Sequence, residues 1–168
     1  MPRVYLSLGS NIEPRRYLCA ALDALAERFG PHLMMSPVYE SRAVGFVGDN
    51  FLNLVVSIDT ELAVGALARV LRDIEDANHR CRSAARFSAR TLDIDILTYG
   101  EEVGSIDGIC LPRDEITRHA FVLRPLADLA PAALHPQLRK SYGQLAAELT
   151  FPNQPLSLVD LGWPIKAS

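Results

Sequence analysis

Alternating hydrophobic and polar positions predict that residues 91–97 form a half-buried β-strand, with Leu92, Ile94 and Ile96 on its apolar face. Because successive side chains of a strand point to opposite faces, Asp93 and Asp95 share one face and the apolar side chains share the other. A second alternating stretch begins at Phe51, and there Phe51 and Asn53 lie opposite the leucine, valine and isoleucine side chains. Each predicted strand therefore has one apolar face and one face with polar or aromatic side chains.

Apolar residues at helical spacing predict two long helices. The first opens at Pro14 and ends before Gly30, and the second starts at or just after Thr60. The four principal strands are expected at about residues 4–8, 33–40, 51–59 and 91–97. A short strand within residues 102–111, a last helix over about 142–149 and an extended, proline-containing tail are expected after them.

The order strand, helix, strand, strand, helix, strand is that of ferredoxin-like α+β folds. In such a fold an antiparallel sheet has helices on one face, so we expect the other face to be open for a ligand. We expect one domain over residues 1–168, with a core of about 4–150 and an extended C-terminal tail. The two aspartates, the asparagine and the phenylalanine described above would all lie on the open face.

The composition is that of a soluble globular protein, with 49% hydrophobic and 22% charged residues. A formal net charge of -3 gives no reason to expect a nucleic-acid or membrane partner. The sequence has no apolar run of membrane-spanning length, and its start lacks the apolar region of a signal peptide. Cys19, Cys81 and Cys110 are odd in number and far apart, which argues against a disulfide framework or a zinc site. We therefore expect a cytoplasmic protein. We also expect a monomer, although none of these features bears on the oligomeric state.

Arginines are concentrated just before the strand predicted at residues 91–97. Arg80, Arg82, Arg86 and Arg90 have no acidic residue between them. Guanidinium groups match phosphate oxygens, and two carboxylates on one open face can hold Mg²⁺ when phosphates complete its shell. Each signal alone has an ordinary explanation, because paired aspartates are common on strands and arginines near a helix end are often solvated or cap carbonyls. Together they favour chemistry on a polyphosphate.

Phe51 and Asn53 have two interpretations. An asparagine beside an aromatic residue usually only fills the solvated face of a strand. The pair can also bind a flat heterocycle, because the aromatic ring can stack on it while the neighbouring amide binds its polar edge.

Three acidic residues, Asp73, Glu75 and Asp76, lie near the end of the second predicted helix, where the helix dipole disfavours them. Two roles are open for these acids. They either bind a ligand or partner group, such as a ribose hydroxyl or a distant arginine, or are simply solvated.

Five strings of residues, in this order, resemble the 6-hydroxymethyl-7,8-dihydropterin pyrophosphokinases of folate biosynthesis. They are Leu8-Gly9-Ser10-Asn11, Tyr39 with Gly45, Phe51-Leu52-Asn53, Arg90-Thr91-Leu92-Asp93-Ile94-Asp95-Ile96-Leu97, and Phe121-Val122-Leu123 with Pro125-Leu126 and Ala130-Pro131. The resemblance covers about residues 4–135, and the string from Arg90 to Leu97 is its most specific part. It implies transfer of a pyrophosphoryl group from ATP to the hydroxymethyl oxygen of the pterin, with release of AMP.

The resemblance also implies which residues meet the substrates. Asp93 and Asp95 are expected to bind two Mg²⁺ ions, and Arg80 and Arg90 are expected at the phosphates, all four as catalytic residues. The residues expected around the pterin, which would stack between the two phenylalanines, are Ser41, Ala43, Val44, Phe51, Asn53 and Phe121. The residues expected around ATP are Glu75, Arg82, Phe87, Ile96, Arg113 and His119.

The chain departs from the usual residues of that family mainly on the ATP side. Arg113 stands where a histidine that contacts ATP phosphate is usual, and Arg118-His119 stands where an arginine is usual. Phe87 replaces a tryptophan, and Phe51 replaces a tyrosine. Arg113 can still bind phosphate, but it cannot share a proton as a histidine can.

Three alternatives to the pyrophosphokinase therefore stay open. One is a diverged relative that acts on a related pterin alcohol, and another is a non-catalytic pterin or nucleotide binder. The third is a nucleic-acid-binding ferredoxin-like domain, which the negative net charge and the carboxylates on the open face disfavour.

Overall fold

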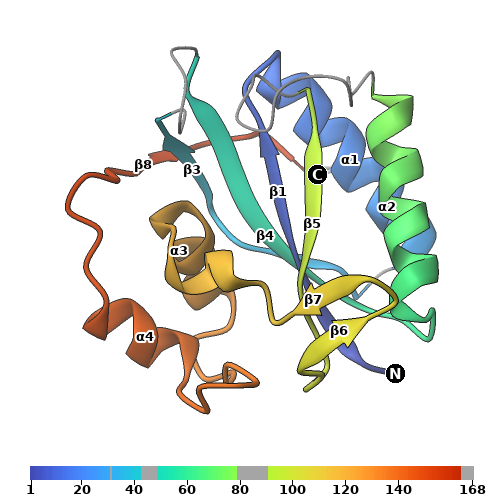
Figure 1. Cartoon of the computed structure of the whole chain (residues 1–168). Coiled ribbons are helices and arrows are strands. Elements are labelled where there is room, and N and C mark those ends of the chain that lie inside the picture. Colours follow the sequence, from blue (N-terminus) through green and yellow to red (C-terminus); the bar gives the residue numbers. More distant parts are fainter. Residues whose placement is uncertain (31, 43–48, 79–90, 164–168) are drawn as a thin grey trace.

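A computed structural model describes residues 1–30, 32–42, 49–78 and 91–163. Within these residues, six strands form one antiparallel sheet, and four α-helices pack against it (Figure 1). The strands of this sheet are β1 (Arg3–Ser10), β2 (Met34–Met35), β3 (Val38–Ser41), β4 (Phe51–Asp59), β5 (Asp93–Tyr99) and β8 (Ser157–Val159). The helices are α1 (Pro14–Phe29), α2 (Val64–Ala77), α3 (Ala120–Leu129) and α4 (Tyr142–Glu148).

The strand order is β5-β1-β4-β3-β8, with β2 beside β4. The two long strands β1 and β4 lie in the middle and pair antiparallel along their whole length, from Arg3 opposite Asp59 to Ser10 opposite Leu52. A hairpin of β6 (Gly104–Ile106) and β7 (Ile109–Leu111) follows β5, and a short 3-10 helix, η1 (Asp114–Thr117), leads into α3. The element order through β5 agrees with the sequence analysis, except that the second predicted strand is divided in two, and a two-stranded hairpin stands where one short strand was expected within residues 102–111.

One face of the sheet packs against α1 and α2. The alternating apolar residues of β5 lie on this face beside Leu6 and Leu8 of β1, and Leu67 and Leu71 of α2 cover them. These leucines are at most 2% exposed. Full burial of such a side chain contributes about 1.5–3 kcal/mol, so this core accounts for the apolar residues at alternate positions of β5.

The other face of the sheet carries α3 and α4, so the expectation of a face without helices is wrong for part of its area. Val55 of β4 and Leu97 of β5 lie on this face and pack with Val122 and Leu126 of α3 and Tyr142 of α4. The reason is visible in the sequence, because the polar faces of both strands become apolar at Val55 and Leu97. An apolar patch of this kind needs a cover, and the two short helices supply it.

Three further boundaries differ from the predictions. The strand expected at 33–40 is divided into β2 and β3, because Ser36 between them bonds to both backbone groups of Val55, through its N–H (2.8 Å) and its hydroxyl (2.9 Å). Helix α2 begins at Val64 rather than near Thr60. The tail is not only extended, since its strand β8 pairs with β3. No helix in the described part of the chain has the length and apolar character needed to cross a membrane.

Candidate functional site

Asp93 and Asp95 lie on the same face of β5, as the alternation predicts. Asp93 pairs with Gly9 of β1, and Asp95 pairs with Ser7. Both partners are small, so each carboxylate has space above the neighbouring strand. The Asp95 side chain is 28% exposed.

The surroundings of Asp95 disfavour its charge. Burial, the carboxylate of Asp93, and the further carboxylates of Glu115 and Glu75 raise the pKa of Asp95 to about 7, against the lowering effect of Arg113. Negative charge is therefore crowded at this point of β5, and a divalent cation bound by the two aspartates would relieve the repulsion. In the described residues no group of three or more His, Cys, Asp or Glu side chains gathers as a metal site. Two carboxylates on one face fit a cation such as Mg²⁺ whose remaining ligands are phosphate and water oxygens.

Arg113 lies directly beside this carboxylate pair. Its Nη2 is 3.5 Å from Oδ1 of Asp95, and its Nε is 2.9 Å from Oε1 of Glu115. Its backbone N–H donates to the carbonyl of Leu97 at 2.8 Å, which ties η1 to β5. Burial alone would lower the pKa of Arg113, but the neighbouring carboxylates outweigh that effect and raise it. We call Asp93, Asp95, Arg113 and Glu115 the carboxylate region.

Glu75 is buried and supports β5 from behind. It belongs to the last turns of α2, and its Oε2 accepts a hydrogen bond of 2.7 Å from the backbone N–H of Ile94. Ile94 stands between the two aspartates on the edge strand of the sheet. Among the strands that the structure describes, β5 has no neighbour on this side, so the buried Ile94 N–H has no backbone acceptor there, and the Glu75 carboxylate accepts its hydrogen bond instead.

Ser41, Phe51 and Asn53 come together where β3 meets β4. Ser41 pairs with Phe51 across the two strands, and Asn53 pairs with Tyr39. The buried amide of Asn53 donates from Nδ2 to the Ser41 hydroxyl oxygen at 2.7 Å. This bond fixes the orientation of the amide. We call Ser41, Phe51 and Asn53 the amide region.

Gly9 separates the amide region from the carboxylate region. It pairs with Asn53 on one side and with Asp93 on the other, so all three lie in one row across the sheet. A Cβ at Gly9 would lie 3.1 Å from Oδ1 of Asn53 and 3.8 Å from the Phe51 ring. The glycine therefore leaves a flat floor of backbone between the amide and the carboxylate, and the amide oxygen faces that floor.

Phe121 and His119 lie at the start of α3. Their rings stack with centroids 4.7 Å apart and 15° between planes. Burial lowers the pKa of His119, which favours the neutral imidazole. Phe121 packs against the apolar cluster that contains Val55, and Val55 shares its face of β4 with Phe51 and Asn53. The phenylalanine is thus on the same side of the sheet as the amide region.

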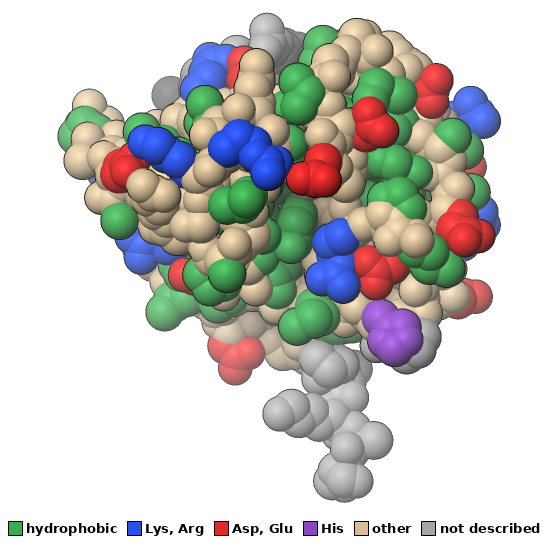
Figure 2. Space-filling view, turned by 90° about the horizontal axis from the view of Figure 1, so that it is seen from below, with side chains coloured by type: hydrophobic (Ala, Val, Ile, Leu, Met, Phe, Trp, Pro, Cys, Tyr) green, Lys and Arg blue, Asp and Glu red, His purple; other side chains and the backbone are tan. Residues whose placement is uncertain are grey.

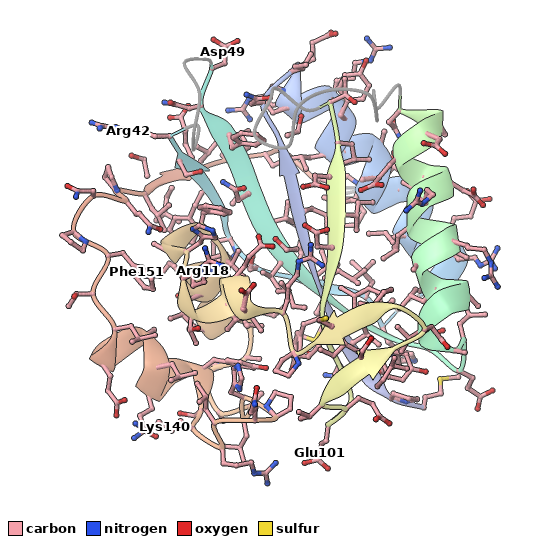
Figure 3. All side chains as sticks on the ribbon, viewed as in Figure 1. Arg42, Asp49, Glu101, Arg118, Lys140 and Phe151 are labelled. Carbon is pink, nitrogen blue, oxygen red and sulfur yellow. The ribbon has the colours of Figure 1, made fainter. Side chains whose placement is uncertain are left out.

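The remaining predicted site residues divide into two groups. The Ile96 side chain is buried among the residues that face α1 and α2, so a ligand on the opposite face would meet only its backbone. Six predictions lie outside the described residues: Ala43, Val44, Arg80, Arg82, Phe87 and Arg90. Ala43 and Val44 belong to residues 43–48, and Arg42 and Asp49 lie on either side of this segment. These two flanking residues are next to the ends of β3 and β4 that point upward in Figure 3.

Sequence reasoning missed three residues of this surface. Gly9 and Ser7 provide the space between the two regions, and their small size next to an alternating apolar strand is a signal that could have identified them. Glu115 was also missed, although its position two residues after Arg113 allows a local ion pair. Away from the site, the face seen in Figure 2 carries positive and negative side chains side by side, with apolar ones between them.

Comparisons with known proteins identify the family that the chain resembles over most of its length. Residues 5–131 match the family described as 7,8-dihydro-6-hydroxymethylpterin-pyrophosphokinase (HPPK). The 2-amino-4-hydroxy-6-hydroxymethyldihydropteridine pyrophosphokinase of Pseudomonas aeruginosa is 41% identical over 148 residues, which are 86% of this chain and 91% of the relative. The protein of the same name from Aquifex aeolicus is 34% identical over 152 residues, 89% of this chain and 94% of the relative.

Solved structures with a similar fold include Plasmodium falciparum HPPK-DHPS with pteroate. The TM-score is 0.67 at 13% identity, and the match covers 94% of this chain and 49% of the other. The chain thus spans about half the length of that protein, and the likeness at this identity concerns the fold alone.

Proposed function

The chain belongs to the 7,8-dihydro-6-hydroxymethylpterin-pyrophosphokinase family, and from this premise we propose that it transfers pyrophosphate from ATP to 6-hydroxymethyl-7,8-dihydropterin in folate biosynthesis. The observation that carries the proposal is the row Asp93, Gly9, Asn53 across three neighbouring strands. Strands lie about 4.8 Å apart, so the amide and the carboxylate are separated by roughly 10 Å of sheet. A two-ring heterocycle on the glycine floor would reach from one to the other.

The pterin ring binds at the amide region in this proposal. The amide oxygen of Asn53 accepts hydrogen bonds from the N–H groups of the ring, while the Ser41 hydroxyl holds the amide in place. Phe51 and Phe121 stack on the two faces of the ring, and the backbone at Ala43 and Val44 binds its polar edge. His119, stacked on Phe121, supports that ring from behind.

The triphosphate binds at the carboxylate region. Asp93 and Asp95 would hold two Mg²⁺ ions, which supply charge neutralisation of the phosphate oxygens when bound. Arg80, Arg90 and Arg113 bind the phosphates, and Arg82, Phe87 and His119 surround the nucleotide. Ile96 meets it through its backbone only, and Glu75 acts through its hydrogen bond to the backbone of β5.

The reaction needs positioning and neutralisation of charge rather than a covalent nucleophile. The hydroxymethyl oxygen forms a bond to the β-phosphorus of ATP, the bond between that phosphorus and the bridging α,β-oxygen breaks, and AMP leaves. The hydroxyl proton is lost to solvent. Asn53 and the phenylalanines hold the attacking oxygen near the aspartates, and the arginines hold the β- and γ-phosphates in line with it.

We further propose a ferredoxin-like architecture in which the sheet face at Asp93, Gly9 and Asn53 is the open ligand-binding surface. The order β5-β1-β4-β3, with α1 and α2 together on one face, supports this assignment. The chain would act as one domain over residues 1–168, as a monomer, in the cytoplasm.

Release of AMP from Mg-ATP tests the function directly, measured with and without 6-hydroxymethyl-7,8-dihydropterin. We expect AMP only when the pterin is present, and no ADP. Turnover of a related pterin alcohol in preference to this one would identify a diverged relative. Pterin binding without AMP would instead make the protein a binder and would overturn the proposed reaction.

A further inference from the structure

Arg113 is a cation built into the carboxylate region. Its guanidinium lies 3.5 Å from Asp95 on one side and 2.9 Å from Glu115 on the other. It is only 34% exposed at the side chain, so solvent screens these contacts less than those of a surface pair. An arginine held in this way is an internal counter-ion for the aspartate that faces the ligand surface.

The backbone around Arg113 keeps the guanidinium in reach of Asp95. Its N–H donates to the Leu97 carbonyl at 2.8 Å, which fixes its position relative to β5. Ile116, three residues further on, is fully buried and anchors η1 in the second core. The segment that carries Arg113 is therefore fixed to the same strand as the two aspartates.

We propose that Arg113 competes with the divalent cation for Asp95, so that nucleotide-free protein binds Mg²⁺ weakly. The phosphates of ATP end this competition by binding the guanidinium themselves. This inference rests on the proposed function for the identity of the ligands. A dication and a guanidinium that share one carboxylate repel each other. When phosphate oxygens arrive, they offer the guanidinium another anion, and the forked guanidinium is suited to bind them. Metal and nucleotide then favour each other's binding, with Arg113 as the coupling residue.

The test measures Mn²⁺ binding by electron paramagnetic resonance and Mg²⁺ binding by calorimetry, both on protein without substrates. Arg113→Gln keeps most of the side-chain length but removes the charge, and we expect it to tighten metal binding about ten-fold, within the usual 5- to 150-fold range of coupling between ligands. Arg113→Lys keeps the charge, and its metal affinity should stay within about three-fold of the unaltered protein.

Arg118→Gln is the matched control. Arg118 lies five residues along the same segment, is 61% exposed and pairs with Asp114 at 2.9 Å. Figure 3 shows it beside α3 rather than over β5. Arg118→Gln removes one positive charge, as Arg113→Gln does, so any effect of net charge alone appears equally in both variants. Thermal unfolding of each variant establishes that it is folded.

A double-variant cycle locates the competition at Asp95. In an Asp95→Asn background, Arg113→Gln should no longer tighten metal binding, because the shared carboxylate is gone.

A nucleotide analogue tests the effect of phosphate on the competition. In α,β-methylene ATP a methylene group replaces the oxygen between the α- and β-phosphorus, so the analogue cannot release AMP. Adding this analogue should increase the metal affinity of the unaltered protein more than it increases that of Arg113→Gln. Unchanged metal affinity in Arg113→Gln, or equal tightening in the Asp95→Asn background, would overturn the proposal. Release of AMP by the unaltered protein is measured separately, so failure of the reaction and failure of the competition are distinguished.

Discussion

The amide region and the carboxylate region lie on one sheet face but are stabilised in opposite ways. In the amide region, the polar groups of Ser41 and Asn53 bond to each other, and the bond is buried. In the carboxylate region, three carboxylates share one guanidinium, and the pKa of Asp95 is raised to about 7 by burial and by the neighbouring carboxylates. The amide region is complete in the protein alone, whereas the carboxylate region is stabilised further when cations and phosphates bind.

One surface can serve two substrates because its two regions have different physical requirements. A site that selects a flat ring needs fixed shape, and internal hydrogen bonds provide it at little electrostatic cost. A site that neutralises a polyphosphate needs strong charges, which repel each other until the ligand arrives. Variants in the carboxylate region should therefore change rate and ion binding, and variants in the amide region should change pterin affinity.

The largest expected effect comes from Asp95→Ala. We expect turnover to fall by about a thousand-fold or more, equivalent to about 4 kcal/mol of transition-state stabilisation, because a metal ligand is lost. The fold should remain intact, since the side chain lies on the ligand surface and not in either apolar core. AMP release and thermal unfolding check the two statements. A large drop in melting temperature with activity retained would contradict both.

Asn53→Ala should remove the hydrogen bond within the amide region and leave the carboxylate region unchanged. The pterin should bind more weakly by about 1–3 kcal/mol, because its polar edge loses a buried partner. Affinity for ATP should stay the same. Ser41→Ala is the matched variant, and it should cost less, about 0.5–1.5 kcal/mol, since it only releases the amide. Equilibrium titration with each ligand measures these values, and unchanged pterin affinity would remove Asn53 from the pterin site.

Glu75 distinguishes support of β5 from contact with ATP. Glu75→Ala should lower the free energy of unfolding by about 1–3 kcal/mol without any ligand, because the Ile94 N–H loses its acceptor. Glu75→Gln keeps an acceptor oxygen and should stay within about 1 kcal/mol of the unaltered protein. Urea unfolding measures both, and Asp73→Ala in the same helix is the control. Equal stability of Glu75→Ala and Glu75→Gln would mean that the carboxylate does not support the strand.

The smallest effect concerns the pH dependence of Asp95. Its raised pKa means that the folded state holds this proton more tightly than the unfolded state, where an aspartate titrates near about 3.9. The ionised carboxylate therefore costs stability as pH rises through this window, and the cost is complete above about pH 7. In the presence of a chelator, Asp95→Asn should raise the free energy of unfolding by about 1–2 kcal/mol at about pH 8 and leave it unchanged at about pH 4.

Denaturant unfolding at the two pH values tests this expectation. Asp114→Asn is the control, because Asp114 is 72% exposed and lies in the same segment as Arg113. An Asp95→Asn variant that is no more stable at high pH would show that the neighbouring carboxylates do not strain this position.

Much of the architecture could be predicted because the period of the apolar residues is set by the backbone. The alternation around Asp93 and Asp95 defined β5 and placed both carboxylates on one face, and the structure confirms this. The same reasoning failed at Val55 and Leu97. These apolar residues lie on the otherwise polar face and must be buried, but the sequence of a strand does not say which segment of the chain buries them. Pairing across strands also has no local signal, so the floor at Gly9 and the row that joins it to Asn53 became visible only in the folded sheet.

The site could be predicted in part for a related reason. Residue types that bind phosphate or metal are few, so the sequence alone indicated the aspartates and arginines. Whether a charged side chain meets a ligand or another side chain depends on its three-dimensional neighbours. Arg113 shows this, since its contacts with Asp95 and Glu115 come from the placement of η1 against β5.

The pairing of β8 with β3 has a consequence for self-association. Residues 157–159 cover the backbone edge of the strand that ends in Ser41, and β8 itself is only three residues long, which makes it a poor template for another chain. A chain shortened before Ser157 would present the N–H and carbonyl groups of β3 to solvent. An unpaired edge can pair with a strand of another copy, so we expect a chain without residues 157–159 to aggregate more readily than the full chain.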